Sequence, residues 1–305
     1  MASHFATKEP VVLPPNFRFS FLETGKGFRV QCDDGQYVTG LPIEWAFGAG
    51  EHAVTFVSKV DRQFYIEHSL SYFKDTASLD LTSGHERLSR NTVNQAMGQP
   101  LKVEGSGPTI VNCFQCHSTG PVSVSGNSEI GITESGVRCE ACHGPGGSHR
   151  DAAAAGHRDD TRNLIRNPKR FSAGELNNFC GTCHRSASDD FNWNSAWNVR
   201  HQPPFLARSR CFLSGAGALT CITCHDPHEG VQRDPAYYGR KCATCHNTRT
   251  AAPKEICQAG NVSGCTGCHM PVVMAGAHLQ FRNHWIGVYR GGESLRPLIS
   301  PSRLQ

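Results

Sequence analysis

Hydrophobic and polar residues alternate along the chain between Phe17 and about Phe73, with short turn sequences between the alternating stretches. "FRFSF" and "FRVQC" both alternate, "TGKG" separates them, and "DDGQ" follows the second. A period of two is typical of strands with one buried face, and short glycine-containing segments between such strands indicate tight turns. "HAVTFVSKVDRQFYIEHSLSYF" predicts a further hairpin with its turn around Val60 to Gln63. The pattern predicts a small β-rich N-terminal region, residues 1–104.

The alternation stops after "GSGP" at residues 105–108. "SAGEL", which runs from Ser172 to Leu176, has the form of a capping box, in which Ser172 and Glu175 satisfy backbone N–H groups at the start of a helix. "DAAAAGHR" at 151–158 is a second helical segment, and the connections carry glycine and proline. We therefore predict a second domain, residues 105–305, made of short helices and irregular segments.

Composition raises the question of what fills this second domain, because it contains few aliphatic residues. Hydrophobic residues make up 38% of the chain, and its mean hydropathy is -0.40. The formal net charge of +4 comes without a long run of like charges, so we infer no nucleic-acid binding. No stretch approaches the roughly 18 to 20 apolar residues that span a bilayer. The start, "MASHFATKEPVVLPPNF", also lacks the continuous apolar core of a secretory signal.

Cysteine supplies the candidate chemistry. The chain has 15 cysteines, and all except Cys32 lie between residues 113 and 268. Most of them belong to a Cys-x-x-Cys-His sequence that occurs six times, far more often than chance allows. The six motifs are Cys113-Cys116-His117, Cys139-Cys142-His143, Cys180-Cys183-His184, Cys221-Cys224-His225, Cys242-Cys245-His246 and Cys265-Cys268-His269.

Three interpretations of these motifs compete. Disulfides within Cys-x-x-Cys would be strained and would leave the histidine without a role. Pairs of Cys-x-x-Cys sequences about twenty residues apart can form a zinc site of four thiolates, and the spacings after Cys221 allow this. Zinc, however, does not require a histidine at the same position in every motif, whereas covalent c-type heme does. The two thiols add to the vinyl groups of the heme, and the adjacent imidazole becomes the proximal ligand of the iron. The motifs therefore predict six c-type hemes.

Six hemes also account for the shortage of aliphatic residues, because the macrocycles themselves are apolar and would form much of the core. The irregular spacing of the motifs excludes a regular repeat array. Such crowding of the motifs predicts hemes that pack against one another as a path for electrons.

Several segments resemble the multiheme c-type cytochromes, in particular the tetraheme cytochromes of nitrifiers and their larger multiheme relatives. They are "GVRCEACHGPGGSH", "RHQPPFLARSRCF", "LTCITCHDPHEG", "SGCTGCHMP" and "FRNHWIGVY". The resemblance extends over about residues 105–290 and is much weaker before that. It implies a mostly irregular or α-helical cytochrome core, with short helices around packed c-type hemes, preceded by the β-rich region. It also implies export to the periplasm or the cell exterior, where this kind of heme attachment takes place.

The resemblance further implies that histidines outside the motifs ligate the far side of neighbouring hemes. In this family a histidine shortly after the motif binds a different heme, which marks His149 and His228 as distal ligands. The remaining candidates are His201, His284, His52, His85 and His278. The same exported context tolerates disulfides, and we expect one between Cys211 and Cys257, with Cys32 left as a buried free thiol.

The function expected from these features is electron transfer along six mostly bis-histidine hemes, with redox proteins or extracellular electron acceptors as partners. An enzyme is the alternative, a multiheme reductase or oxidase of a small nitrogen or sulfur compound, which needs one iron with an open position. The six regular motifs and the surplus of histidines favour a carrier, so the chain is more an electron carrier than an enzyme. Surplus histidines are also compatible with a homo-oligomer or a cytochrome filament.

Overall fold

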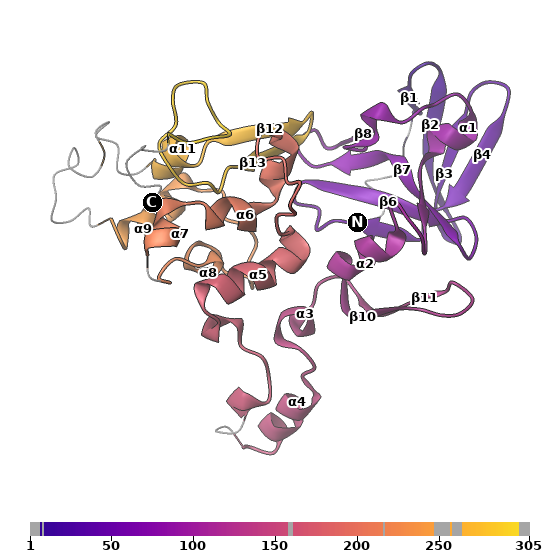
Figure 1. Cartoon of the computed structure of the whole chain (residues 1–305). Helices are drawn as coiled ribbons and strands as arrows, with labels where there is room; N and C mark the ends of the chain where they lie inside the picture. The colour runs from indigo at the N-terminus through magenta and orange to yellow at the C-terminus, as the bar shows by residue number, and fades with distance from the viewer. Residues whose placement is uncertain are drawn as a thin grey trace. The chain divides into compact units, whose positions relative to one another are not determined.

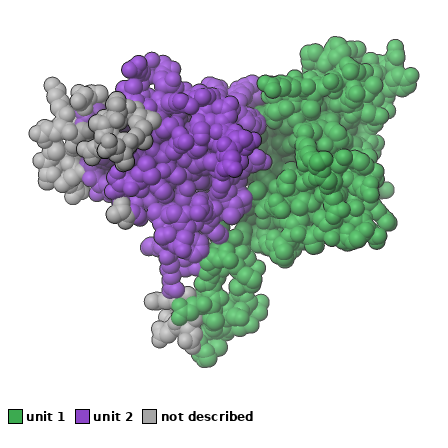
Figure 2. Space-filling model, in the orientation of Figure 1, with its two compact units in different colours: residues 1–166 green, residues 167–305 purple. Residues whose placement is uncertain are grey.

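The computed structural model describes residues 7, 9–157, 161–215, 217–246, 257 and 264–298. The chain divides into two compact units, residues 1–166 and residues 167–305, which Figure 2 shows in different colours. The boundary expected between residues 104 and 105 falls inside the first of these units. The separation of a β-rich region from a cytochrome domain at that point stays a prediction.

A four-stranded antiparallel sheet opens the first unit (Figure 1). In β2 the side chains of Phe17, Phe19 and Phe21 are buried while Arg18 between them is exposed, as the alternation of "FRFSF" predicts. The sheet has the order β1-β2-β3-β4 and each strand pairs with the next along the chain. The strands are β1 (Val11–Leu13), β2 (Phe17–Thr24), β3 (Gly27–Asp33) and β4 (Val38–Pro42).

A second antiparallel sheet is centred on the long strand β7. The hairpin predicted around Val60 to Gln63 is confirmed, because β6 and β7 pair on either side of that turn. β9 returns to pair with β7, which therefore has neighbours on both edges and a largely buried middle. The strands are β5 (Trp45–Phe47), β6 (Ala53–Lys59), β7 (Phe64–Phe73), β8 (Ser78–Leu81) and β9 (Gly98–Lys102).

Two apolar clusters fill the first unit. One combines the inward phenylalanines of β2 with Val30 and Cys32 of β3 and with Ala96 and Met97 of the short helix α1 (Val93–Met97). The other surrounds Ile110 and Phe114 of α2 (Ile110–His117). The β-rich region thus has an ordinary side-chain core.

The fold class expected for the remainder was wrong. The chain is about 30% helix and 28% strand, with several antiparallel sheets, so its core is not mostly helical or irregular. Two hairpins lie within the part of the chain where strand alternation was expected to stop. They are β10 (Ser118–Val124) with β11 (Ile130–Ser135), and β12 (Val272–Gly276) with β13 (Leu279–Arg282).

The first of these hairpins forms for a tertiary reason. Val122 pairs with Ile132 and Val124 with Ile130, and these four side chains pack against the cluster around Phe114. Gly120 and Pro121 interrupt the alternation at a shift in the strand register, which hides the pattern in the sequence. Burial against an existing apolar cluster therefore outweighs the weak local signal.

Short helices connect the sheets and make up much of the second unit. The capping box expected at Ser172 and Glu175 is confirmed at the start of α5. The segment "DAAAAGHR" is helical as far as Ala154. The other α-helices among the described residues are α3 (Cys139–His143), α4 (Gly147–Ala154), α5 (Ala173–His184), α6 (Gln202–Ala207), α7 (Arg210–Ser214), α8 (Cys221–Cys224), α9 (Pro235–Ala243) and α11 (Cys265–His269). In the same described ranges, 3₁₀ helices span His85–Arg87, Thr161–Asn163, Pro168–Arg170 and Ala196–Arg200.

The second unit has a small aromatic core instead of an aliphatic one. Val199, Phe205, Val273 and Trp285 form its buried cluster. The guanidinium of Arg208 lies over the ring of Trp193, 3.7 Å from its centroid, beside this cluster. Among the described residues of this unit, the other buried hydrophobic side chains are Leu176 and Leu206. So small a set leaves most of the cysteine-bearing helices without apolar side-chain packing. In the part of the chain that the structure describes, no helix combines the length and the apolar character needed to cross a membrane.

Replacing Gly98 by alanine is expected to destabilise the first unit. Gly98 has a φ of +149°, and an added Cβ would overlap the carbonyl oxygen of Glu67 on β7. We expect Gly98→Ala to cost about 3 kcal/mol, through backbone strain and displacement of β9. Gly50→Ala is the matched control, since Gly50 also has a positive φ, +72°, but has open space around it. Thermal unfolding followed by circular dichroism compares the two variants, and equal midpoints would contradict the close approach of β9 to β7.

Candidate heme sites

The cysteine motifs all begin in a helix. The helices α2, α3, α5 and α11 contain the whole motif and end with its histidine, whereas α8 contains both cysteines but not His225, and α9 contains only Cys242. Residues three and four positions apart lie on the same face of an α-helix. In the four motifs that lie wholly within a helix, the two thiols and the imidazole therefore project from one side of one turn, which is the arrangement that a single planar macrocycle needs for two thioether bonds and an axial ligand.

Three motif histidines are held in the tautomer that suits a metal ligand. The Nδ1 atoms of His143 and His269 each donate to a backbone carbonyl, of Arg166 and Gly287 respectively, at 2.8 Å. The Nδ1 atom of His184 lies 3.2 Å from the side-chain oxygen of Gln202. Since a carbonyl oxygen only accepts, Nδ1 carries the proton and the Nε2 atom of the neutral ring keeps its lone pair. Such hydrogen bonds fix the ring orientation of metal-ligating histidines.

The first motif borders a cavity that the sequence did not reveal. A cavity of about 250 Å³ is lined by His117 and, among others, by Trp45, Phe47, Phe114 and Ile132. The ring centroids of Phe47 and His117 are 5.2 Å apart, and burial lowers the pKa of His117. Trp45 and Phe47 belong to β5, a strand of the region that was expected to be separate from the heme sites. An apolar wall beside His117 fits a heme face, and β5 supplies part of that wall.

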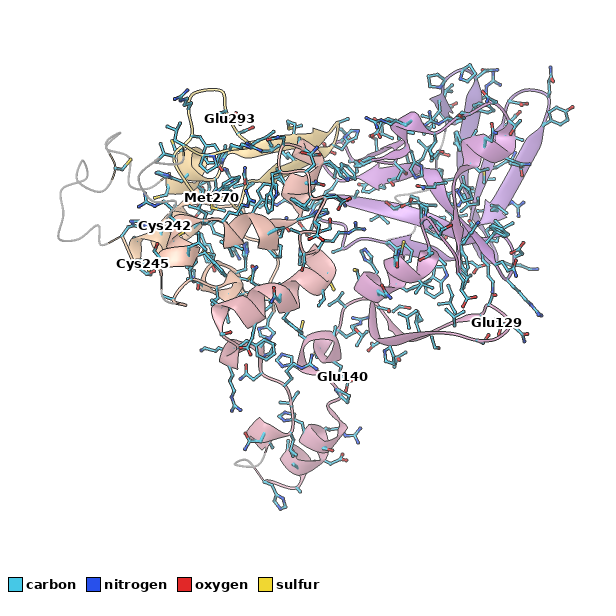
Figure 3. The ribbon with its side chains drawn as sticks, viewed as in Figure 1. Glu129, Glu140, Cys242, Cys245, Met270 and Glu293 are labelled. Carbon is cyan, nitrogen blue, oxygen red and sulfur yellow. The ribbon has the colours of Figure 1, made fainter. Side chains whose placement is uncertain are left out.

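Motifs in the second unit lie close together in two pairs. The thiols of Cys180 on α5 and Cys221 on α8 are hydrogen-bonded, which lowers the pKa of Cys180 to about 7 and raises that of Cys221. Cys242 on α9 is hydrogen-bonded to Cys265 on α11, and burial is the main cause that raises the pKa of Cys242 to about 11. Figure 3 labels Cys242 and Cys245 on and just after α9. The third motif is thus next to the fourth, and the fifth next to the sixth.

The candidate distal histidines differ in how they are placed. His149 and His284 donate from Nδ1 to the carbonyls of Thr161, at 2.8 Å, and Arg282, at 3.0 Å, which leaves Nε2 as the coordinating atom. His228 is exposed, and its Nδ1 lies 3.0 Å from a carboxylate oxygen of Asp226. His201 is buried with neither ring nitrogen hydrogen-bonded, and burial lowers its pKa to about 4. A buried imidazole without partners is costly unless a missing group binds it, so His201 fits a ligand role well.

The other three candidate histidines are less well placed to ligate a heme iron. His85 is buried, and its Nε2 lies 3.2 Å from a carboxylate oxygen of Glu67, which occupies the coordinating atom. His52 is exposed in the loop between β5 and β6. His278 lies at the turn of the β12–β13 hairpin.

A zinc site of four thiolates needs a different grouping. Across the ranges that the structure describes, no set of three or more histidine, cysteine, aspartate or glutamate side chains is arranged to hold a single metal ion. Three features fit a heme better than a single metal ion: the hydrogen-bonded imidazoles, the cavity beside His117 and the unpartnered His201. A heme would be bonded to the two thiols at its edge and to the imidazole at its iron.

Comparison with known proteins points the same way. Residues 70–144, which include the first two motifs, match the family model described as cytochrome c554 and c-prime. Over 147 residues the chain is 26% identical to the multiheme cytochrome MtrA of Shewanella baltica, a match that covers 45% of this chain and 36% of that protein. Over 207 residues it is 25% identical to the C-type polyheme cytochrome OmcC of Geobacter sulfurreducens, covering 54% of this chain and 26% of that one.

These matches support a multiheme c-type cytochrome. The alignments span about a third or less of the length of both relatives, so they support the kind of protein and not a whole-protein activity. No solved structure matches the chain.

Three cysteines of this cytochrome lie outside the motifs. Cys32 is fully buried and free, as expected, and burial raises its pKa to about 12. Cys211 and Cys257 are both free thiols of intermediate exposure in the structure, so the disulfide expected between them is not formed there. Burial raises the pKa of Cys211, and the thiols of the fourth and fifth motifs are its electrostatic neighbours.

Alkylation of the native cytochrome distinguishes these three thiols. At pH 8 a thiol with a pKa near 12 is ionised in only about one molecule in ten thousand, and only the thiolate reacts readily. We expect iodoacetamide to label Cys32 only after unfolding, as measured by peptide mass mapping, and the same map shows whether Cys211 and Cys257 react in the native protein. Labelling of Cys32 in the native state would contradict its burial. Protection of both Cys211 and Cys257 until a reductant is added would restore the disulfide.

Proposed function

We propose that this cytochrome is an electron-transfer protein that carries six c-type hemes, one on each Cys-x-x-Cys-His motif. The proximal ligands are His117, His143, His184, His225, His246 and His269. The observation that carries the proposal is that all six motifs begin in a helix, and that four of them lie wholly within one (α2, α3, α5 and α11), where the thiols and the imidazole share one face. When bound, the heme iron supplies one-electron redox chemistry, and the protein sets its ligation, spacing and exposure.

The packing of the second unit supports this number of cofactors. Its helices α8, α9 and α11 carry motif residues, and among its described residues few buried hydrophobic side chains are available to pack against them. Macrocycles attached through thioethers would take the place of an aliphatic core, as cofactors do in small scaffolds that cannot build one from side chains.

The axial ligands on the far side of the irons are proposed to be mostly histidines. His149, His201 and His284 have the best-placed rings, because each is partly or fully buried with its coordinating nitrogen not claimed by a neighbouring residue. His228 is exposed and oriented by Asp226, and its short link to His225 points it to a neighbouring heme. His52, His85 and His278 are reserve candidates. Imidazole on both sides gives low-spin iron, which suits transfer without substrate binding.

The two pairs of neighbouring motifs would place hemes close enough for electron transfer between them. Hemes attached to Cys180 and Cys221 would meet near their thioether edges, and so would hemes attached to Cys242 and Cys265. Close cofactor edges allow an electron to pass from one heme to the next. The role of α5, α8, α9 and α11 is therefore to fix these separations.

The setting that we propose is periplasmic or extracellular, as the chemistry of covalent heme attachment requires. Redox partner proteins or extracellular electron acceptors would exchange electrons with the relay. A homo-oligomer or a filament is a further possibility of the same chemistry, with a surplus histidine of one copy binding a heme of the next. The mildly basic composition gives no reason to add a nucleic acid.

A second candidate function rests on the cavity beside His117. Among the residues that line it, His117 is the one imidazole, and the others are largely apolar. A heme whose sixth position stayed open there would bind a small nitrogen or sulfur compound, as a reductase or oxidase does. One heme that is high-spin in the wild-type cytochrome and shifts on adding nitrite or hydroxylamine would favour this function over a relay.

The heme count tests the proposal directly. The mass of the intact protein, measured by mass spectrometry, is expected to exceed the mass of its polypeptide by that of six hemes. For the sequence given, the polypeptide mass is 33.3 kDa, and a processed protein is compared with the mass of its own polypeptide. The added mass should remain after extraction with acidified acetone, because thioether bonds hold it. A Cys180→Ala/Cys183→Ala variant should lose one heme and keep five. Extractable heme, or zinc in its place, would contradict the proposal.

A further inference from the structure

We infer that His284 is the sixth ligand of the heme attached to Cys221, Cys224 and His225, so that two imidazoles far apart in the sequence enclose one iron. This inference rests on the proposed function, because it assigns a partner to one of the proposed hemes.

The separation of the two rings matches this role. The ring centroids of His225 and His284 are 6.2 Å apart, and their planes are inclined by 29°. An iron between two imidazoles, with bonds of about 2 Å to each nitrogen, holds the ring centroids about 6 Å apart. The separation of the two rings is therefore the one that a shared iron requires.

The tautomer of His284 also suits a ligand. Its Nδ1 donates to the carbonyl of Arg282 at 3.0 Å, which leaves the lone pair on Nε2. This is the tautomer in which a neutral imidazole binds a metal through Nε2.

The backbone around His284 is fixed by residues from elsewhere in the second unit. Ser209, which is fully buried, donates to the carbonyl of His284 at 2.8 Å and accepts from the amide of Ile286 at 2.7 Å. The guanidinium of Arg282 donates to the carbonyls of Thr266 and Met270, at 3.1 and 3.0 Å. His284 is thus tied to the segment before α7 and to the sixth motif. A ligand held in this way needs little reorganisation to bind.

His184 is the competing partner. It lies near enough to both rings that its charge lowers their pKa values. Its ring is exposed, however. His225 is the partner for which the structure gives a ring separation of the right size.

Electron paramagnetic resonance of the oxidised, heme-loaded cytochrome tests the pairing. His284→Ala should convert one of the six hemes from low-spin to high-spin, with the heme count by intact mass unchanged. His157→Ala is the matched control, because His157 is exposed and outside the proposed ligand set, and it should leave the spectrum unchanged.

A second background identifies which heme has lost its ligand. In a Cys221→Ala/Cys224→Ala protein with five attached hemes, adding His284→Ala should produce no new high-spin signal. A new signal in that background would assign His284 to another heme and overturn the pairing. An unchanged low-spin spectrum in the single variant would also overturn it while leaving the six-heme proposal intact. Wild-type protein without covalent heme would instead refute the proposed function.

His284→Met keeps the test open if the alanine variant does not accumulate. Methionine still binds iron but raises its potential, so this variant should stay low-spin and one of the six reduction steps should move to higher potential. A redox titration identical to that of the wild type would contradict the assignment.

Discussion

The constraint on which the rest depends is that two thiols three residues apart and an imidazole four residues from the first lie on one face of a helical turn. In this chain four motifs lie wholly within a helix, in α2, α3, α5 and α11, and the other two begin in α8 and α9. A planar cofactor fixed at one edge by two bonds and at its centre by an axial ligand has little freedom left. The positions of short helices then determine the positions of the cofactors, and the hydrogen bonds of His143 and His269 show how ring orientation is fixed as well.

The two units differ in the composition of their hydrophobic cores. In the first, alternating phenylalanines of β2 and the buried middle of β7 form an ordinary core between sheets. In the second, a small cluster around Phe205 and Trp285 is the main apolar packing among the described residues. Since burial of apolar surface is the main favourable term in folding, the second unit depends on its cofactors far more than the first. In the first unit, β5 lines the cavity beside His117 and would form a wall of the heme site proposed there.

Short sequence patterns correctly predicted the elements that depend on interactions between residues close in the sequence. The β6–β7 hairpin and the capping box of α5 follow from neighbouring residues, and both are present. The β10–β11 hairpin was missed because its pattern breaks at Gly120 and Pro121 and it forms by packing on Phe114. The approach of Phe47 to His117 and of His284 to His225 joins residues that are distant in the sequence, and no periodicity signals such contacts. Heme attachment could be predicted from the sequence because each motif lies within five consecutive residues. The second axial ligand of each iron could not, because it depends on tertiary structure.

The proposed relay of six hemes would accept a definite number of electrons. Coulometric titration of the intact protein between full oxidation and full reduction measures that number directly. The account predicts uptake of six electrons per chain, reversibly and over a broad range of potential, because hemes of the paired motifs influence one another's reduction. Uptake of only one or two electrons per chain, or a reduction that cannot be reversed, would contradict it.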